Sequence, residues 1–172
     1  MELYLLRHAI AVDRDSRGHK QDSERPLTPK GEAKMRKIAD GMRVLEVEPD
    51  VILSSPYVRA RRTAEIAAAA LGVRTGLLFT DHLAPGGDPE RLVRTVVEDH
   101  AGARGVLLVG HEPGMSTLMS VLLSGGEDVA ILFKKGGLAK LTTENLRHAR
   151  CATLEWLLTP SQLADIGRSS HR

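Results

Sequence analysis

The chain alternates between short apolar runs and longer segments in which apolar residues recur at helical spacing. The runs have the length of buried strands, and a polar residue or a glycine ends each of them. They lie at 2–7, 51–54, 74–80 and 105–110, and CATLEWLL predicts a last strand at 151–158.

The segments between these runs predict helices with capping signals at their ends. Thr28 and Asp88 stand as N-caps directly before a proline, and Ser55 before Pro56 gives the same signal for a helix that ends at Gly72. A fourth helix is predicted over 115–123. The expected core positions of the first and third helices are Met35, Ile38, Ala39 and Met42, and Leu92, Val93, Val96 and Val97.

Strands that alternate with helices indicate a layered α/β protein. Near the end, ILFKKGGLAKLTT predicts a hairpin around Gly136 and Gly137, which adds antiparallel strands. The expected fold is a three-layer α/β/α sandwich whose sheet is mostly parallel with an antiparallel edge. Residues 11–27 form a long polar connection, and without repeats or linkers we expect one domain over 1–172.

Composition narrows the class of protein. The chain has 172 residues, a net charge of +2 and only 3% aromatic residues, which argues against nucleic acid or a membrane as partner. The single cysteine, Cys151, excludes an intramolecular disulfide. The first apolar run is too short for a signal peptide, and no stretch approaches the ~20 apolar residues of a membrane span. We therefore expect a cytoplasmic protein.

Polar residues that suit phosphate chemistry follow three of the predicted strands. Arg7 and His8 end the first, SSPYVRARRTA (54–64) follows the second, and His111 with Glu112 follows the fourth. Ligands of open α/β sheets bind beyond the carboxyl ends of the strands, so these residues are expected to meet. Arginine matches phosphate oxygens, helix N-termini attract anions, and a neutral histidine can accept a phosphoryl group.

These motifs, in this order, resemble the histidine phosphatase superfamily of phosphoglycerate mutases and acid phosphatases. The residues are RHA at 7–9, SPYVRARRTA at 55–64 and GHEPG at 110–114. The compact length, RPLTPKG, FKKGGLAKL and LEWLLTP resemble its small bacterial SixA-type phosphohistidine phosphatases. The resemblance spans nearly the whole chain and implies a phosphoglycerate mutase-like fold. Ala9 departs from the usual glycine after the histidine, a change that SixA-type members tolerate.

The resemblance also implies residue roles. His8 would be the nucleophile that becomes phosphorylated, Arg7 and Arg59 would bind the phosphate, and His111 would be the second histidine of the site. No HxxxH or HxH spacing indicates a metal site, so we expect a metal-independent reaction without a cofactor.

The proton donor is less clear, because no equivalent of the mutase-type glutamate is found. Glu112 occupies the position of the acid in the acid phosphatases, and Asp88 is the other candidate, although it also makes a good helix cap. Arg25, in ERPLTPKG, is expected either to approach the phosphate or to pair with a nearby acid. An imidazole that leaves phosphohistidine can carry its own proton, so a missing acid favours a P–N substrate.

Three functions remain open on the sequence. The first is a phosphohistidine phosphatase that acts on a phosphotransfer domain or a phosphocarrier, since no inserted segment would cover the pocket; we expect a monomer. The second is a phosphomonoesterase for small metabolites or nucleotides. The third is a phosphate-binding module without catalysis. For an enzyme, neutral His8 and charged His111 predict a bell-shaped pH profile.

Overall fold

The computed structural model describes residues 1–14 and 21–169, and its centre is one six-stranded sheet with the strand order β3-β2-β4-β1-β5-β6. β1, β2, β3 and β4 run parallel, whereas β5 is antiparallel to both β1 and β6. The strands are β1 (Glu2–Arg7), β2 (Val51–Ser54), β3 (Leu77–Phe79), β4 (Gly105–Gly110), β5 (Leu138–Thr142) and β6 (Thr153–Leu158). The predicted sheet, mostly parallel with antiparallel pairing at one side, is confirmed.

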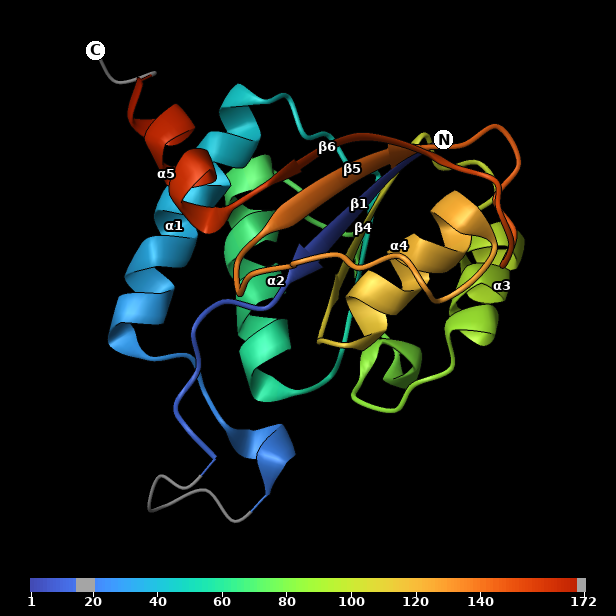
Figure 1. Ribbon diagram of the computed structural model, residues 1–172. Coiled ribbons are helices and arrows are strands. Elements are labelled where there is room, and N and C mark those ends of the chain that lie inside the picture. The colour runs from blue at the N-terminus through green and yellow to red at the C-terminus, as the bar shows by residue number, and fades with distance from the viewer. Residues whose placement is uncertain (15–20, 170–172) are drawn as a thin grey trace.

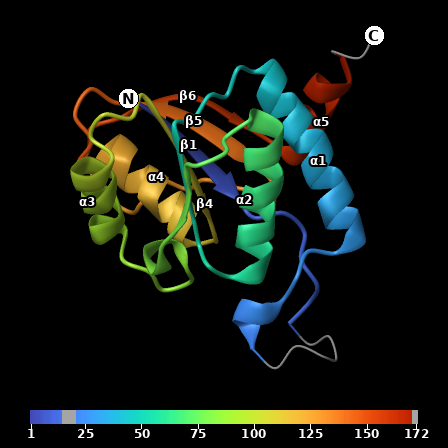
Figure 2. The ribbon, with the colours of Figure 1, turned by 180° about the vertical axis from the view of Figure 1, so that it is seen from behind.

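Helices cover both faces of this sheet and complete the predicted three layers (Figure 1). α1 (Pro29–Val44), α2 (Val58–Leu71) and α5 (Pro160–Ser169) lie on one face. α3 (Pro89–Asp99) and α4 (Gly114–Ser124) lie on the other, as the reverse view in Figure 2 also shows. Two short 3-10 turns, η1 (Asp22–Glu24) and η2 (Asp81–Leu83), lie in connections.

β1 is buried on both faces of the sheet, because successive side chains point to opposite faces and each face is covered by helices. Tyr4 and Leu6 pack into the core beneath α1, α2 and α5, whereas Leu3 and Leu5 pack into the core beneath α3 and α4. All four side chains are almost fully buried. β1 is therefore held rigidly, and so is the residue that follows it.

Most of the predicted elements are confirmed, and two differ in their bounds. Thr28 caps α1 by accepting a hydrogen bond from the Gly31 amide at 2.9 Å. The second helix begins at Val58 rather than at Pro56, because Pro56 and Tyr57 form a bend before it and Tyr57 is its N-cap residue. The strand predicted over 74–80 is limited to β3.

Three predictions at the periphery are wrong or incomplete. Val97 is 41% exposed, so the buried face of α3 consists of Leu92, Val93 and Val96. KKGG is a turn that leads into β5 and not the tip of a hairpin; the hairpin partner of β5 is β6, which comes later in the chain. The helix α5 was not predicted, although Thr159 before Pro160 repeats the signal at Thr28.

The polar connection over 11–27 folds back on itself. Ala11 and Leu27 form an isolated antiparallel bridge, and the Val12 amide donates to the Pro26 carbonyl at 3.0 Å. Gly31 lets this connection pack against α1, because a Cβ there would lie 2.0 Å from the Ile10 carbonyl oxygen. Residues 15–20 of the connection lie outside the described residues.

Across the described residues, none of the helices combines the length and the apolar character that crossing a membrane requires.

Close packing of α1 on α5 gives a stability test. A Cβ at Gly41 would lie 2.1 Å from the Leu163 carbonyl oxygen, so we expect Gly41→Ala to push α5 outward and lower the free energy of unfolding by about 1–3 kcal/mol. Urea denaturation measures this change. Gly102→Ala is the control, because a Cβ at Gly102 meets nothing within 4 Å. Equal stability of the two variants would contradict the expected clash.

Candidate active site

Parallel pairing brings the residues that follow β1, β4 and β2 to one edge of the sheet. Arg7 lies opposite Gly110, and the His8 amide continues the ladder by donating to the Gly110 carbonyl at 3.0 Å. The Ser55 amide likewise donates to the Val109 carbonyl at 3.0 Å. The site predicted at the carboxyl ends of these strands therefore forms from backbone register alone.

His8 is held in one orientation and in one tautomer. Its Nδ1 lies 2.7 Å from the carbonyl oxygen of Ala9, which only accepts hydrogen bonds, so Nδ1 carries the proton. Nε2 then keeps its lone pair, and the Nε of Arg59 points to it at 3.4 Å. Thr63 of α2 fixes this segment, because its hydroxyl oxygen accepts from the Ala9 amide at 3.1 Å. This lone pair, which accepts a long hydrogen bond from Arg59, is what a nucleophile needs.

His111 lies beside His8, with 4.9 Å between the ring centroids. Its Nε2 contacts the hydroxyl of Ser55 at 2.9 Å, and the Tyr57 ring packs edge-on at 5.3 Å. Its Nδ1 is buried and has no hydrogen-bond partner among the described residues. A buried nitrogen without a partner is costly, which marks this atom as one that a ligand would satisfy.

Arg7 lies at the same edge and is anchored by the segment that leads into β5. One terminal nitrogen donates to the Phe133 carbonyl at 2.7 Å, while Nε is buried without a partner within the part of the chain that is described. Gly136 closes this side, since its amide donates to the Arg7 carbonyl at 3.0 Å. Its φ of 79° falls in the left-handed region that favours glycine. The turn at KKGG thus borders the site.

Arg59, in the first turn of α2, is 2% exposed. Its two terminal nitrogens donate to Asp22, one to the main-chain carbonyl at 2.6 Å and one to the carboxylate at 2.8 Å. Its Nε edge is the part that faces His8. Arg59 therefore directs its Nε–H toward His8, and each of its two terminal nitrogens donates one hydrogen bond to the connection over 11–27.

Asp22 is the residue of this site that the sequence analysis missed. Its carboxylate also accepts from Arg25, whose Nε and second terminal nitrogen lie 2.9 and 2.7 Å away. Pairing with an acid is one of the two interactions expected for Arg25. Its remaining terminal nitrogen donates to the Val12 carbonyl at 2.7 Å. Burial alone would raise the pKa of Asp22, but the hydrogen bonds from Arg59 and Arg25 lower it to about 2.

The two candidate acids are both engaged in local hydrogen bonds. The carboxylate of Glu112 accepts from the amide of Ser116 at 3.0 Å and from its hydroxyl at 2.7 Å. Asp88 caps α3 by accepting from the Arg91 amide at 3.0 Å, as its position before a proline predicted. Glu112 therefore lies at the site next to His111, whereas Asp88 acts as the N-cap of α3.

Burial sets the charge of both histidines. Desolvation, followed by the nearby charges of Arg59 and Arg7, lowers the pKa of His8 to about 3. Desolvation, followed by His8 and Arg59, lowers the pKa of His111 to about 3. The expected neutral His8 agrees with this result. In the ligand-free protein His111 is neutral, because the attraction of Asp22 is smaller than the combined effects of desolvation, His8 and Arg59. The charge expected on His111 during the reaction stays a prediction.

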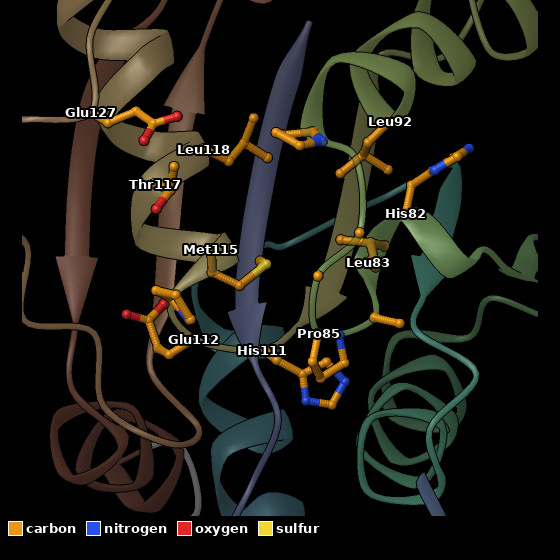
Figure 3. A pocket seen from close by; sticks show the side chains of 16 residues that line it. His82, Leu83, Pro85, Leu92, His111, Glu112, Met115, Thr117, Leu118 and Glu127 are labelled. Atoms are coloured by element: carbon orange, nitrogen blue, oxygen red, sulfur yellow. The ribbon is translucent and has the colours of Figure 1, made fainter. Parts of the chain in front are cut away.

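A cavity of about 290 Å³ opens beside His111, between α4 and the segment from η2 to α3 (Figure 3). Its floor is apolar and includes Leu83, Leu92, Met115 and Leu118. Of the phosphate-directed side chains, His111 lines this cavity, so the cavity adjoins the phosphate site at His111. Within the described ranges, no group of three or more histidine, cysteine, aspartate or glutamate side chains is placed to hold a metal ion.

The buried neutral histidines make folding stability depend on pH. Unfolding restores an ordinary pKa near 6.5, so the unfolded chain binds protons between pH 6.5 and about 3 that the folded chain does not. We expect the free energy of unfolding to fall from pH 7 to pH 5, a range above the titration of Asp22. In His111→Asn the slope should be shallower by up to about 1.4 kcal/mol per pH unit. Identical slopes in urea titrations would contradict the neutral pair.

Sequence and structure comparisons agree with this geometry. Residues 3–81 match the family model described as "Histidine phosphatase superfamily (branch 1)". The chain is 36% identical over 143 residues to an uncharacterized protein of Picosynechococcus sp., covering 82% of this chain and 84% of the relative. It is 28% identical over 166 residues to "Phosphohistidine phosphatase SixA" of Escherichia coli, covering 95% and 96%.

The fold is similar to the solved structure of "the protein histidine phosphatase SixA complexed with tungstate". The TM-score is 0.81 at 26% identity, and the match covers 95% of this chain and 99% of that chain. The sheet and the helical layers therefore have a counterpart over nearly the full length. The chain belongs to the histidine phosphatase superfamily, and this membership supports phosphatase activity.

Proposed function

We propose that this protein is a metal-independent phosphohistidine phosphatase that acts through a phosphorylated His8 intermediate. Its substrate would be a phosphorylated histidine on a cytoplasmic signalling or phosphotransfer protein, such as a phosphotransfer domain or a phosphocarrier. The observation that carries the proposal is the fixed tautomer of His8. Because Nδ1 is bound to the Ala9 carbonyl, the lone pair on Nε2 faces Arg59.

In the first step, Nε2 of His8 attacks the phosphorus and the P–N bond of the substrate breaks. The substrate ring is protonated on its other nitrogen, so the bonding electrons leave on the ring nitrogen that held the phosphorus and a neutral imidazole departs with that proton. Arg7, the Nε of Arg59 and Nδ1 of His111 would bind the phosphoryl oxygens as charge shifts onto them. The negative charge of the phosphoryl group would raise the pKa of His111 and favour its protonated form.

In the second step, water attacks phospho-His8. The new P–O bond forms as the bond between phosphorus and Nε2 breaks, and the electron pair returns to Nε2. Of the two water protons, one stays on the new oxygen and the other passes to a phosphoryl oxygen, so inorganic phosphate leaves the site with both. The hydrogen bond from Nδ1 to Ala9 persists throughout, so His8 ends each cycle in the tautomer that begins the next one.

The local hydrogen bonds of both candidate proton donors support a P–N substrate over a phosphate ester. Glu112 accepts two hydrogen bonds from Ser116, and Asp88 caps α3. An alkoxide leaving group needs a proton donor, whereas a neutral imidazole does not. The similarity to a relative named phosphohistidine phosphatase SixA supports the same choice.

Loss of the nucleophile tests the mechanism. We expect His8→Ala to lower kcat for p-nitrophenyl phosphate and for a phosphohistidine peptide by at least about a thousandfold, both assayed with EDTA present. Wild type should form an acid-labile, base-stable phosphoenzyme that the variant lacks. His100→Ala, at the end of α3, is the matched control. A fully active His8→Ala protein would rule out the mechanism, and ester hydrolysis without phosphohistidine hydrolysis would rule out the substrate class.

Asp22 gives a second test, because it orients Arg59 but adds negative charge beside an anion site. In Asp22→Asn we expect kcat to fall roughly ten- to a hundredfold, since Arg59 loses its charged anchor. Inhibition by inorganic phosphate should become stronger, because the competing carboxylate is neutralised. Asp99→Asn at the exposed end of α3 is the control. An unchanged kcat in Asp22→Asn would show that Asp22 does not position Arg59.

A further inference from the structure

The cavity beside His111 continues from the phosphate site toward the far end of α4. Its apolar floor is formed by Met115 and Leu118 on the α4 side and by Leu83 and Leu92 on the opposite side (Figure 3). All four are at most 5% exposed, so the floor is part of the core and is not free to rearrange. A group that leaves the phosphorus on the side of His111 and Glu112 would enter this cavity first.

Charge differs sharply between the phosphate site and the cavity. Arg7, Arg59 and Arg25 surround the phosphate side. The charged residues that line the cavity are both acids, Glu112 and Glu127, and its described lining includes no lysine or arginine. Figure 3 places these two glutamates toward opposite ends of the α4 side. The cavity therefore disfavours an anionic leaving group and favours a cationic one.

The size and the apolar floor narrow the ligand further. A volume of about 290 Å³ is at the small end for ligand sites, so it suits one side chain rather than a nucleotide. Lysine and arginine combine an apolar methylene stem with a terminal charge. The stem would cover the leucines of the floor, and the charge would reach a carboxylate on the rim. Glu127 is exposed and has no hydrogen bond or ion pair with the described residues, so its charge is available.

We propose that this cavity is a specificity subsite that binds the side chain of a lysine or arginine flanking the phosphohistidine of the substrate protein. The inference rests on the proposed function, because it assigns the leaving group to a protein segment. It adds that the enzyme selects among phosphohistidine proteins by a basic neighbour of the phosphorylated residue. Anionic metabolites would be poor substrates for the same electrostatic reason.

A positional peptide series tests the subsite. Phosphohistidine peptides on an alanine and glycine background carry one lysine, norleucine or glutamate at each of the four positions on either side of phosphohistidine. We expect at least one position where lysine raises kcat/KM over glutamate by roughly fivefold or more, with norleucine between them. Norleucine keeps the apolar stem and lacks the charge, so it separates the two contributions.

Variants outside the catalytic residues locate the preference. Glu127→Lys should abolish or reverse the preference for lysine, and Thr117→Trp should reduce it by filling the cavity, which Thr117 lines. Both should hydrolyse p-nitrophenyl phosphate within about twofold of wild type, because this small ester does not need the cavity. Glu144→Lys is the matched control, since Glu144 follows β5 at the opposite edge of the sheet.

The outcomes separate this inference from the proposed function. Hydrolysis of all peptides at similar rates, or a lysine preference that survives in Glu127→Lys, would overturn the subsite and leave the phosphatase in place. Hydrolysis of p-nitrophenyl phosphate without hydrolysis of any phosphohistidine peptide would overturn the proposed substrate class itself. A lysine preference that only Glu127→Lys and Thr117→Trp remove supports the subsite.

Discussion

The parallel pairing of β1 with β4 is the constraint on which the site depends. It places His8 and His111 side by side without any contact between their side chains being required first. Because both strands are buried on both faces, this register cannot slip without exposing the core. The adjacent β2 adds Ser55 and then α2, so the four phosphate-directed residues come from three strand ends that the core holds fixed.

Burial at this edge has a cost that shapes the chemistry. Two neighbouring imidazoles and a buried guanidinium cannot all be charged in a poorly hydrated pocket, so the histidines are neutral and Arg59 takes a carboxylate partner. The neutral state is what His8 needs to act as a nucleophile. The same burial leaves Arg7 Nε and His111 Nδ1 without hydrogen-bond partners among the residues that the structure describes, which prepares the site for an oxyanion.

The two ends of the site have opposite electrostatic character. Arginines gather where the phosphoryl group would lie, and glutamates line the cavity where the leaving group would pass. A site with this polarity separates an anionic phosphate from a neutral or cationic remainder of the substrate. A phosphorylated histidine in a basic protein segment has that charge distribution, whereas a phosphorylated carboxylic acid is anionic at both ends.

The sequence by itself determined the order of strands and helices, the residues at the strand ends and the family, because apolar periodicity and caps act over a few neighbouring residues. The hairpin predicted around KKGG is wrong, because a glycine pair predicts a turn but does not determine that β5 pairs with the later strand β6. Only the tertiary structure decided that Asp22 pairs with Arg59, that His111 is neutral and that the cavity carries acids. These depend on side chains from distant segments sharing one poorly hydrated space, where burial and charge act together.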